Sequence, residues 1–254
     1  MNQVLRERLK IVNNKTHFGF ESVNKNVKAK KVKGVFESVA TRYDLMNSLM
    51  SGGLHKIWKK YLTQVLILKN NSKILDLASG TGDVCIELSN QNKNFQIFHT
   101  DINIKMLEQG KIKLIDHGKI IPSIVCDAEK IPFPSNYFDC ITIAFGLRNV
   151  TNKEEALSEM YRVLSPGGKL VILEFSKIWA PLSKIYDGFS FNILPKLGKI
   201  FVKDESSYQY LVESIRMHPD QKTLQSMMQN QGFDNTGFQN LSGGIVAIHQ
   251  GYKF

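Results

Sequence analysis

One acidic residue and several small ones lie together in the run Asp76-Leu77-Ala78-Ser79-Gly80-Thr81-Gly82. The run follows a short apolar segment that predicts a strand, and small side chains there let the backbone come close to a ligand. A dinucleotide fingerprint would need a third glycine, but the residue three positions after Gly82 is Cys85. Taken alone, the run fits either a ligand-binding loop or an ordinary turn.

Two further carboxylates follow two further predicted strands. Asp101 ends the segment 95–101, and Asp127 comes directly after the segment 120–126. In open α/β sheets, ligands bind at this edge of the sheet. A carboxylate there can accept both hydroxyls of a ribose, with charge-assisted bonds of roughly 1.5–3 kcal/mol each. Each aspartate alone could be a helix N-cap, but three at successive strand ends favour a bound nucleoside.

Apolar segments alternate with segments of helical periodicity through the middle of the chain. Strands are predicted over residues 73–77, 95–101, 120–126, 137–144 and 169–175. Helices are predicted between them, over residues 83–90, 104–115 and 154–164. Gly243-Gly244 separates two more strand-like segments and predicts a hairpin. The expected fold class is therefore α/β, with a doubly wound, mostly parallel sheet of seven strands.

The predicted organisation is a polar N-terminal arm over residues 1–30 and a single domain over 31–254. Within the domain we expect N-terminal helices over 32–66, broken at Ser51-Gly52-Gly53, and a cofactor-binding core over 70–176. A helix and hairpin are expected over 221–254. Between core and hairpin, residues 181–215 predict a helical insert that is rich in aromatic side chains: Tyr186, Phe189, Phe191, Phe201, Tyr208 and Tyr210.

The composition, 43% hydrophobic and 22% charged, is that of an ordinary globular protein. No apolar run approaches the roughly 18 residues needed to span a bilayer, and the N-terminus lacks the apolar region of a secretory signal. Three cysteines without metal-ligand spacing are expected to be buried thiols in a reducing cytosol: Cys85, Cys126 and Cys140. The net charge of +10 permits an anionic membrane or a nucleic acid as partner, and several lysines lie early in the chain: Lys25, Lys28, Lys30, Lys31 and Lys33.

The order of these features resembles the class I S-adenosylmethionine-dependent methyltransferases over residues 70–176, including Pro166-Gly167-Gly168 before the fifth strand. The resemblance implies S-adenosylmethionine as cofactor and no metal. One departure is that the family often has glycine where Ala78 or Ser79 stands, which puts the path of the loop in doubt. The implied cofactor-binding residues are Asp76, Ser79, Gly80, Thr81, Gly82, Asp101, Ile102, Asp127, Ala128 and Ala144.

A second block is Tyr43-Asp44-Leu45-Met46-Asn47, followed by Met50-Ser51, His55 and Trp58. It resembles the signature of the ubiquinone/menaquinone biosynthesis C-methyltransferases. Residues 144–150, 162–168 and 214–219 also resemble blocks of that family, although Ser165 replaces the usual lysine. The whole resemblance spans residues 16–254. It implies methylation of a ring carbon of a polyprenylated hydroquinone, either a benzoquinol, a naphthoquinol or both.

The resemblance also implies an acceptor pocket formed by Tyr43, Asp44, His55, Arg148 and Asn149. A base or hydrogen-bond acceptor for the phenol would come from His55, Asp44 or Tyr43, or from a water relay, and Arg148 would stabilise the phenolate. Each residue also has a structural alternative. Trp58 in particular could only pack its helix on the domain, and Arg148 could pair with an acid.

Other targets remain open from the sequence. Residues 145–149 hold no Asn/Asp-Pro-Pro-aromatic motif, which disfavours methylation of amino groups, and the chain has no Pro-Cys pair for one mode of RNA cytosine methylation. A methyltransferase for RNA or another small molecule, a non-catalytic scaffold and a dinucleotide-dependent oxidoreductase are the alternatives.

The expected partners follow from the implied substrate. A polyprenyl tail stays in lipid, so we expect the protein at the cytoplasmic, inner face of the membrane, bound peripherally through the early lysines and the aromatic insert. A complex of quinone-biosynthesis enzymes or a homo-oligomer is a further expectation, and no nucleic acid is expected.

Overall fold

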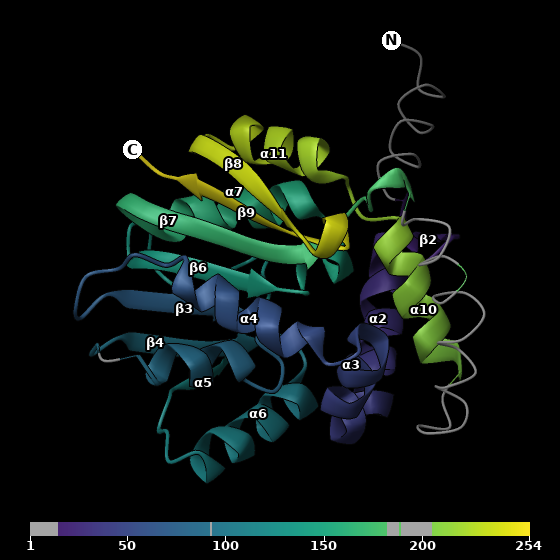
Figure 1. Cartoon of the computed structure of the whole chain (residues 1–254), viewed down its shortest axis with the longest axis horizontal. Coiled ribbons are helices and arrows are strands. Elements are labelled where there is room, and N and C mark those ends of the chain that lie inside the picture. Colours follow the sequence, from purple (N-terminus) through teal and green to yellow (C-terminus); the bar gives the residue numbers. More distant parts are fainter. Residues whose placement is uncertain (1–14, 92, 182–187, 189–204) are drawn as a thin grey trace.

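The computed structural model describes residues 15–91, 93–181, 188 and 205–254. Seven strands form one sheet in the order β5-β4-β3-β6-β7-β9-β8 (Figure 1). The first five in the chain are parallel, and β9 runs antiparallel to β7 and β8. The strand bounds are β3 Lys73–Leu77, β4 Gln96–Asp101, β5 Ser123–Val125, β6 Phe138–Ala144, β7 Leu164–Phe175, β8 Asp234–Leu241 and β9 Val246–Tyr252. The predicted fold class is confirmed, and the order reverses between β3 and β6, where such sheets bind ligands.

Two apolar layers enclose the sheet because neighbouring residues of a strand face opposite sides. On β3, Ile74 belongs to one buried cluster and Leu75 to the other. The first cluster is completed by α4 (Leu54–Gln64), α5 (Asp83–Ser89) and α6 (Ile104–Asp116). The second is completed by α7 (Lys153–Val163) and α11 (Gln221–Asn230), which lie on the other side of the sheet from α5 and α6 (Figure 1).

The chain before the sheet is more ordered than its polar composition predicts. Residues 1–14 lie outside the described residues, but β1 (Lys15–Phe18) and β2 (Glu21–Asn24) form an antiparallel hairpin. Helix α2 (Lys25–Val39) begins directly afterwards. The polar arm predicted over residues 1–30 therefore contains a hairpin and the start of α2 from Lys15 onward. The ring of Phe18 stacks on Tyr210 with centroids 4.2 Å apart, which anchors the hairpin to the rest of the protein.

Three helices lie at the carboxyl edge of the sheet, where the parallel strands end. They are α2, α3 (Tyr43–Ser51) and α10 (Glu205–Arg216), and α2 contacts both of the others (Figure 1). A short turn of 3₁₀ helix, η1 (Ala40–Arg42), joins α2 to α3. The chain breaks after α3 as predicted, because Gly52 and Gly53 both adopt positive φ, at +57° and +82°. Segments from both ends of the sequence thus cover the same edge.

The predicted insert over residues 181–215 is described only in part. Its last third forms α10, in which Tyr208 and Tyr210 are buried. The other predicted aromatic side chains lie outside the described residues: Tyr186, Phe189, Phe191 and Phe201. The hairpin at Gly243-Gly244 is confirmed, with a short 3₁₀ turn, η4 (Ser242–Gly244), between β8 and β9.

Of the five strands predicted for the core, two differ from the predicted bounds by more than one residue. Strand β7 begins at Leu164 rather than at residue 169, because Leu164 pairs with Phe138 before a register shift, and pairing resumes between Lys169 and Cys140. The Pro-Gly-Gly run lies within that irregular start and does not precede the strand. Strand β5 is shorter than the predicted 120–126, covering only Ser123–Val125 at the edge of the sheet.

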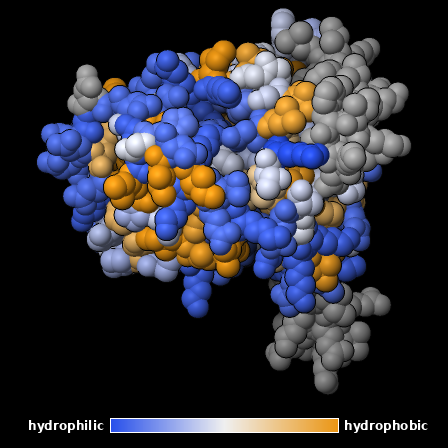
Figure 2. All heavy atoms as spheres, turned by 90° about the horizontal axis from the view of Figure 1, so that it is seen from below, coloured by the Kyte–Doolittle hydropathy of each residue, from blue (hydrophilic) through white to orange (hydrophobic). Residues whose placement is uncertain are grey.

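The face that carries α6 mixes apolar and polar side chains (Figure 2). Exposed isoleucines on α6 and just after it contribute to this face: Ile104, Ile112, Ile115 and Ile120. Within the described part of the chain, none of the helices has the length and apolar character needed to cross a bilayer.

Candidate active site

The loop after β3 is held against β4. The backbone N–H of Ser79 donates to the carbonyl of Thr100 at 2.9 Å, and Gly80 and Gly82 take positive φ of +56° and +79°. Ala78 also lies in the left-handed region, at φ +48°, which residues with a side chain rarely adopt. The loop therefore keeps a glycine-like path. Gly146 leaves room for the side chain of Ala78, because a Cβ on Gly146 would lie only 2.5 Å from the Cβ of Ala78.

Asp101 closes this loop from the neighbouring strand. Its Oδ2 accepts the N–H of Gly80 at 3.0 Å, and its Oδ1 accepts the N–H of Asn103 at 2.8 Å. Burial raises the pKa of Asp101 to about 6. Each carboxylate oxygen can accept a second hydrogen bond, so the side chain fits the vicinal hydroxyls of a ribose. Ile102, the next residue, is exposed.

The third predicted aspartate is placed differently. Asp127 is exposed, and its Oδ1 accepts the N–H of Glu129 at 2.9 Å, in the turn that follows β5. Ala128 beside it is buried, whereas Ala144 at the end of β6 is half-buried. The ends of β4, β5 and β6 thus line one edge, as predicted, with an apolar floor beside Asp127.

The side chain of Asp76 lies deeper in the protein than the side chains that would contact a ligand directly. It is fully buried, and its two oxygens accept from the hydroxyl of Thr142 at 2.7 Å and from the thiol of Cys85 at 3.3 Å. Burial raises the pKa of Asp76 to about 7. The contact between Asp76 and the cofactor that the resemblance implies would therefore have to compete with these two partners.

Asp76→Asn is expected to remove part of the pH dependence of stability. The pKa of Asp76 is higher in the folded state than the usual 3.8, so the folded protein binds the extra proton. The stability from this group is present at low pH and is lost as pH rises through about 7. We expect the melting temperature of Asp76→Asn to exceed that of the wild type more at pH 8 than at pH 5, by thermal denaturation without ligand. Asp220→Asn is the control, since hydrogen bonds to Thr223 lower the pKa of that aspartate. An equal difference at both pH values would contradict the protonated Asp76.

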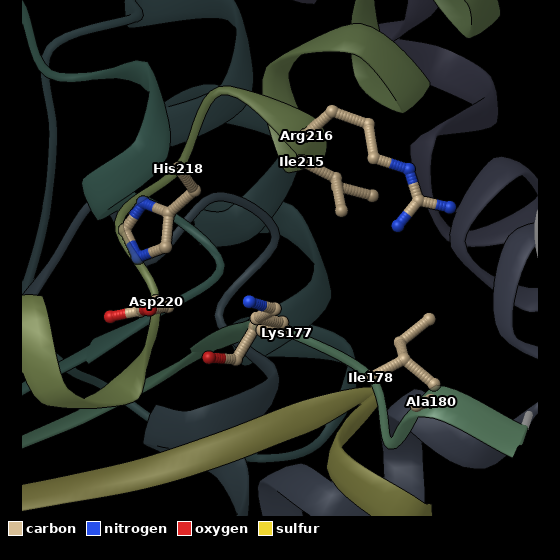
Figure 3. A pocket seen from close by; sticks show the side chains of 8 residues that line it. Lys177, Ile178, Ala180, Ile215, Arg216, His218 and Asp220 are labelled. Atoms are coloured by element: carbon tan, nitrogen blue, oxygen red, sulfur yellow. The ribbon is translucent and has the colours of Figure 1, made fainter. Parts of the chain in front are cut away.

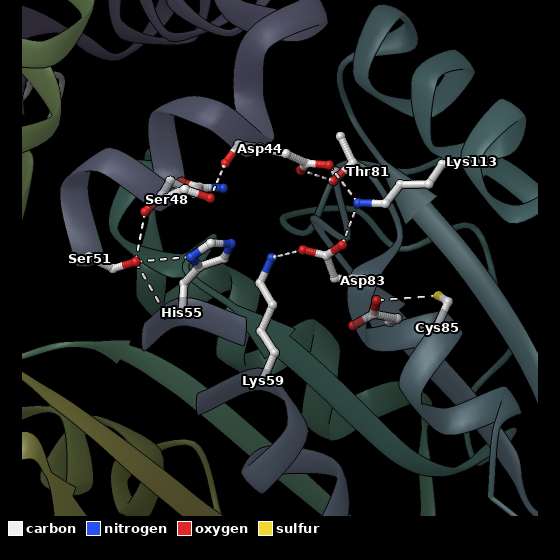
Figure 4. Close-up of polar contacts among 12 residues, drawn as sticks. Asp44, Ser48, Ser51, His55, Lys59, Thr81, Asp83, Cys85 and Lys113 are labelled. Carbon is white, nitrogen blue, oxygen red and sulfur yellow. Dashed lines mark hydrogen bonds and ion pairs between the residues drawn. The ribbon is translucent and has the colours of Figure 1, made fainter. Parts of the chain in front are cut away.

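A chain of charged groups joins α3, α4, α5 and α6 beneath the loop (Figure 4). Asp44 accepts from the hydroxyl of Thr81 at 2.8 Å and from the ammonium of Lys113 at 2.5 Å. Lys113 also contacts Asp83 at 2.6 Å, and Asp83 contacts Lys59 at 2.7 Å. The two ammonium groups hold the pKa of Asp83 well below its usual range. The network fixes the predicted acceptor residue Asp44 directly to the cofactor loop.

Three members of this network were not predicted from the sequence. Asp83 directly follows Gly82, and Lys59 directly follows Trp58, so both lie next to predicted residues. Lys113 comes from the middle of α6 and has no motif around it. A hollow of about 330 Å³ lies beside the network and is lined by Tyr43, Asp44, Thr81 and Lys113 among others.

His55 presents one bare nitrogen inside the protein. The hydroxyl of Ser51 donates to the carbonyl of Asn47 at 2.7 Å, and Ser51 has only one proton. The contact of 2.9 Å between Ser51 and Nδ1 of His55 therefore uses the proton on Nδ1, which leaves Nε2 as an acceptor. Nε2 is buried without a partner among the described residues. Burial, together with the nearby Lys59, lowers the pKa of His55 to about 4, so the ring is neutral at pH 7.

Tyr43 and Trp58 have different surroundings. The ring of Tyr43 lies over the loop, with Cε1 3.6 Å from where a Cβ on Gly80 would stand. Trp58 is buried, and its Nε1 donates to the hydroxyl of Ser242 at 3.0 Å. Its ring packs against Phe145 with centroids 6.2 Å apart. Trp58 thus holds α4 on the sheet, in keeping with the structural alternative.

Arg148 and Asn149 form a second group, in the short 3₁₀ helix η2 (Leu147–Asn149) after β6. The guanidinium of Arg148 donates to Glu174 at 2.8 Å, and both side chains are almost fully buried. Asn149 accepts from the hydroxyl of Tyr210 at 3.0 Å. The structure therefore brings Tyr43 and Asp44 to the loop, whereas His55 contacts Ser51 on α3. It gives Arg148 an acidic partner, as its structural alternative predicted.

A family model described as the ubiE/COQ5 methyltransferase family matches residues 24–253. The chain belongs to this family. It is 56% identical over 241 residues to the ubiquinone/menaquinone biosynthesis C-methyltransferase UbiE of Paraburkholderia xenovorans, covering 94% of this chain and 99% of the relative. The enzyme of the same name from Burkholderia mallei is 55% identical over the same shares.

Solved structures support the fold. A possible histamine N-methyltransferase from Thermotoga maritima, described as S-adenosylmethionine-dependent, has a TM-score of 0.60 at 18% identity, covering 87% of this chain and 99% of its own. A putative methyltransferase structure from Haloferax volcanii, in complex with the activator Trm112, has a TM-score of 0.62 at 12% identity, covering 85% and 96%. At these identities the likeness concerns the fold alone.

The protein is a methyltransferase that uses S-adenosylmethionine as the methyl donor. The described residues fit this cofactor. The left-handed loop 78–82 gives close backbone approach, and the carboxylate of Asp101 is already ordered by two backbone N–H groups. Bound at this edge, the cofactor would place its ribose on Asp101 and its adenine beside Asp127 and Ala128.

Proposed function

We propose that this protein transfers a methyl group to a ring carbon of a polyprenylated hydroquinone, in the synthesis of ubiquinone, menaquinone or both. The support is the identity of 55–56% to relatives that carry this activity in their names. The observation that carries the proposal is the hydrogen bond between Asp44 and Thr81. It joins α3, which carries residues proposed to line the pocket of the methyl acceptor, to the loop 78–82, which is proposed to bind the methyl donor.

S-adenosylmethionine supplies an electrophilic methyl group at this site. The chain contributes the arrangement: the loop 78–82 and Asp101 would hold the donor, and α3, joined to the loop through Asp44 and Thr81, would cover it. Holding two reactants in line can supply roughly 7–11 kcal/mol of the barrier. The ring carbon forms the new C–C bond as the methyl leaves sulfur, and the ring then loses one proton to restore its aromaticity.

The residues proposed for the acceptor fall into three groups. Asp44 is held by Thr81 and Lys113, and Arg148 by Glu174, so we assign both to positioning α3 and η2. Tyr43 lies beside the loop 78–82, and Asn149 lies beside Tyr210. His55 offers a bare acceptor nitrogen, so we propose it as the hydrogen-bond acceptor for a phenolic hydroxyl.

His55→Ala is expected to lower kcat by roughly 10²-fold, the lower range for a group that takes part in proton transfer. Its affinity for S-adenosylhomocysteine should stay within about twofold, because no cofactor contact is removed. Because the pKa of His55 lies near 4, the rate loss should be the same at pH 6.5 and pH 8. His117→Ala, on the exposed end of α6, is the control. Unchanged kcat, or a loss confined to cofactor affinity, would exclude this role.

The experiment that tests the function is the quinone profile of cells lacking the protein, measured by mass spectrometry. Accumulated demethyl species are expected, and their ring identifies the benzoquinol or naphthoquinol substrate. In parallel, methyl-³H transfer by the purified protein should label a lipid extract and not total RNA. Label in RNA alone with a normal quinone profile would replace the proposal with RNA methylation.

We also propose that the protein acts peripherally, at the inner face of the cytoplasmic membrane, where its substrate lies. Of the early lysines, Lys30 and Lys33 are exposed, but Lys28 is buried and donates to the carbonyl of Val150 at 2.9 Å. Lys28 is therefore removed from the proposed lipid contact. Flotation with anionic liposomes should carry the protein upward, and Lys30→Glu, Lys33→Glu should reduce this. Equal flotation with neutral liposomes would contradict a role of the lysine charges in membrane binding.

We also propose that the protein joins a complex of quinone-biosynthesis enzymes or forms a homo-oligomer, because its proposed substrate belongs to that pathway. Size-exclusion chromatography tests this proposal.

A further inference from the structure

Strand β4 holds Gly80 on both sides, through Asp101 and through His99. The carboxylate of Asp101 accepts the N–H of Gly80 at 3.0 Å. On the other side of the same Cα, Nε2 of His99 lies 3.0 Å from the carbonyl oxygen of Gly80. Both peptide groups that flank this glycine, which has a φ of +56°, are therefore fixed from one strand.

The surroundings of His99 decide which ring nitrogen carries the proton. The carbonyl oxygen of Gly80 can only accept, so Nε2 donates to it. His99 is fully buried, and burial lowers its pKa, so the ring is neutral at pH 7 and Nδ1 carries no proton. Nδ1 accepts from the hydroxyl of Ser123, which lies 3.0 Å away. The ring is thus bound at both nitrogens, and Nε2–H is presented to the loop in one orientation.

Helix α6 packs directly behind this contact. A Cβ on Gly110 would lie 2.5 Å from the carbonyl oxygen of Gly80 and 2.6 Å from Cε1 and Nε2 of His99. All three residues are buried. Loss of the imidazole donor would therefore leave a buried carbonyl without a partner, a state that backbone groups in proteins rarely adopt.

The contact with His99 also fixes the direction of the next N–H group, that of Thr81. In a trans peptide the C=O and N–H bonds point in opposite directions, so the N–H of Thr81 points away from His99. This N–H forms no hydrogen bond to any of the described residues. The hydroxyl of Thr81, in contrast, donates to Asp44 at 2.8 Å. The N–H is therefore an available donor on the side of the loop opposite His99.

The order of the strands indicates which part of the cofactor would reach Thr81. Adenine is expected beside Asp127 and Ala128 after β5, and the ribose on Asp101 at the end of β4. The loop 78–82 follows β3, the next strand across the sheet, so the amino acid end of S-adenosylmethionine would extend over it. The carboxylate of that end only accepts hydrogen bonds, so it matches a backbone N–H.

We propose that His99 is a positioning residue for the methyl donor. By binding the carbonyl of Gly80, His99 sets the N–H of Thr81 as the hydrogen-bond donor for the carboxylate of S-adenosylmethionine. His99 itself touches neither the cofactor nor the methyl acceptor. The inference concerns the donor alone, so it holds whichever ring receives the methyl group.

Isothermal titration with two ligands tests this role. S-adenosylhomocysteine has the amino acid end, whereas 5′-methylthioadenosine has the adenine and ribose without it. His99→Leu should raise the Kd of S-adenosylhomocysteine about tenfold, as for loss of one hydrogen bond, and that of 5′-methylthioadenosine by less than about twofold.

Two conservative variants separate the two ring nitrogens of His99. The amide nitrogen of glutamine can reach the place of Nε2, so His99→Gln should bind S-adenosylhomocysteine within about twofold of the wild type. The amide of asparagine reaches only as far as Nδ1, so His99→Asn should show the same loss as His99→Leu. A packing role alone would not distinguish the two amides in this way.

His249→Leu is the matched control. Nε2 of this buried histidine lies 2.9 Å from the carbonyl oxygen of Gln221, the same kind of contact in another part of the protein. His249→Leu should lower the melting temperature, as His99→Leu does, but it should leave both Kd values unchanged.

A second control tests another location for the carboxylate. A cavity of about 400 Å³ lies between the residues after β7 and the end of α10, and the cationic residues Lys177 and Arg216 line it (Figure 3). No residue of the loop 78–82 lines this cavity. Lys177→Met should therefore bind S-adenosylhomocysteine as the wild type does, and a tenfold loss would place the carboxylate there and overturn the proposal.

Two other results would also overturn it. One is an equal loss of affinity for both ligands in His99→Leu, which would show that His99 only maintains the loop. The other is an equal loss in His99→Gln and His99→Asn, a comparison that decides the matter even where His99→Leu does not fold. Long-range ¹H–¹⁵N NMR spectra of the wild type should show the proton of His99 on Nε2, and a proton on Nδ1 would contradict the contact with Gly80.

Discussion

Asp101→Asn is expected to weaken S-adenosylmethionine binding by about two orders of magnitude or more. The carboxylate is already aligned by the N–H groups of Gly80 and Asn103, so its remaining lone pairs can accept the hydroxyls of a bound ribose. Charge-assisted hydrogen bonds contribute roughly 1.5–3 kcal/mol each, and every 1.4 kcal/mol is about tenfold in affinity. Isothermal titration with S-adenosylhomocysteine measures the effect.

A control carboxylate lies at the opposite edge of the sheet. Asp139 accepts the N–H of Lys73 at 2.8 Å near the start of β3, so Asp139→Asn should leave cofactor affinity unchanged. The pKa of about 6 adds a second check on Asp101. Since the ionised form accepts the ribose hydroxyls, the wild-type affinity should fall as pH is lowered from 7 to 5. Similar affinities for Asp101→Asn and Asp139→Asn would exclude the ribose contact.

Glu174→Ala is expected to lower the free energy of unfolding by about 3–5 kcal/mol, the range for breaking a buried ion pair by removing one partner. Glu174 accepts from both the guanidinium and the backbone N–H of Arg148, and no solvent reaches the charge that would remain. For a protein of this size the loss corresponds to a melting temperature lower by roughly 10 °C. Urea denaturation followed by circular dichroism gives the free energy.

Two companion variants make the result interpretable. Glu174→Gln keeps the volume and one acceptor oxygen, so it should lose less stability than Glu174→Ala and should still fold. Glu37→Ala breaks an exposed pair with Lys33, separated by 3.8 Å, and should change stability by less than about 1 kcal/mol. Equal losses for Glu174→Ala and Glu37→Ala would show that the buried pair adds nothing beyond a surface pair.

The sequence predicted the core of the sheet well because each strand there is a short apolar run bounded by clear turn or cap residues. Strand β3 has the predicted bounds Lys73–Leu77, and the helix after Asn103 begins at the predicted Ile104. Asn103 caps that helix by accepting from Lys105 and Met106. Local signals of this kind are complete within a few residues, so they can be read without knowing the fold.

The hairpin of β1 and β2 could not be predicted in the same way. Each strand has only four residues with a largely polar pattern, so periodicity gives no signal. Its anchoring comes from the stacking of Phe18 on Tyr210, which lie far apart in the sequence. The irregular start of β7 could not be predicted either, because its sequence carries no local signal for a strand. Pro166 and Gly167 are residues that normally end a helix and do not begin a strand.

In the candidate site, positions were predictable and partners were not. Parallel strands end at one edge, so Asp101 and the loop 78–82 had to meet there. Nothing local, however, shows that Arg148 pairs with Glu174 or that Asp76 is engaged by Thr142 and Cys85. The network through Lys59 and Lys113 was missed for the same reason, since its members come from separate helices.

The close approach of Ala78 and Gly146 makes the effect of a substitution at one of these positions depend on the residue at the other. A methyl group at 146 would meet the methyl group of Ala78 at 2.5 Å, so only one of the two sites can carry a side chain. With glycine at the position of Ala78, the shortest contact of an alanine at position 146 disappears, and the next one is 3.1 Å to Cγ1 of Ile143. The pair should therefore show epistasis: Gly146→Ala should be more harmful in this background than after Ala78→Gly. An engineer who transplants the donor loop from a relative should move residue 146 with it.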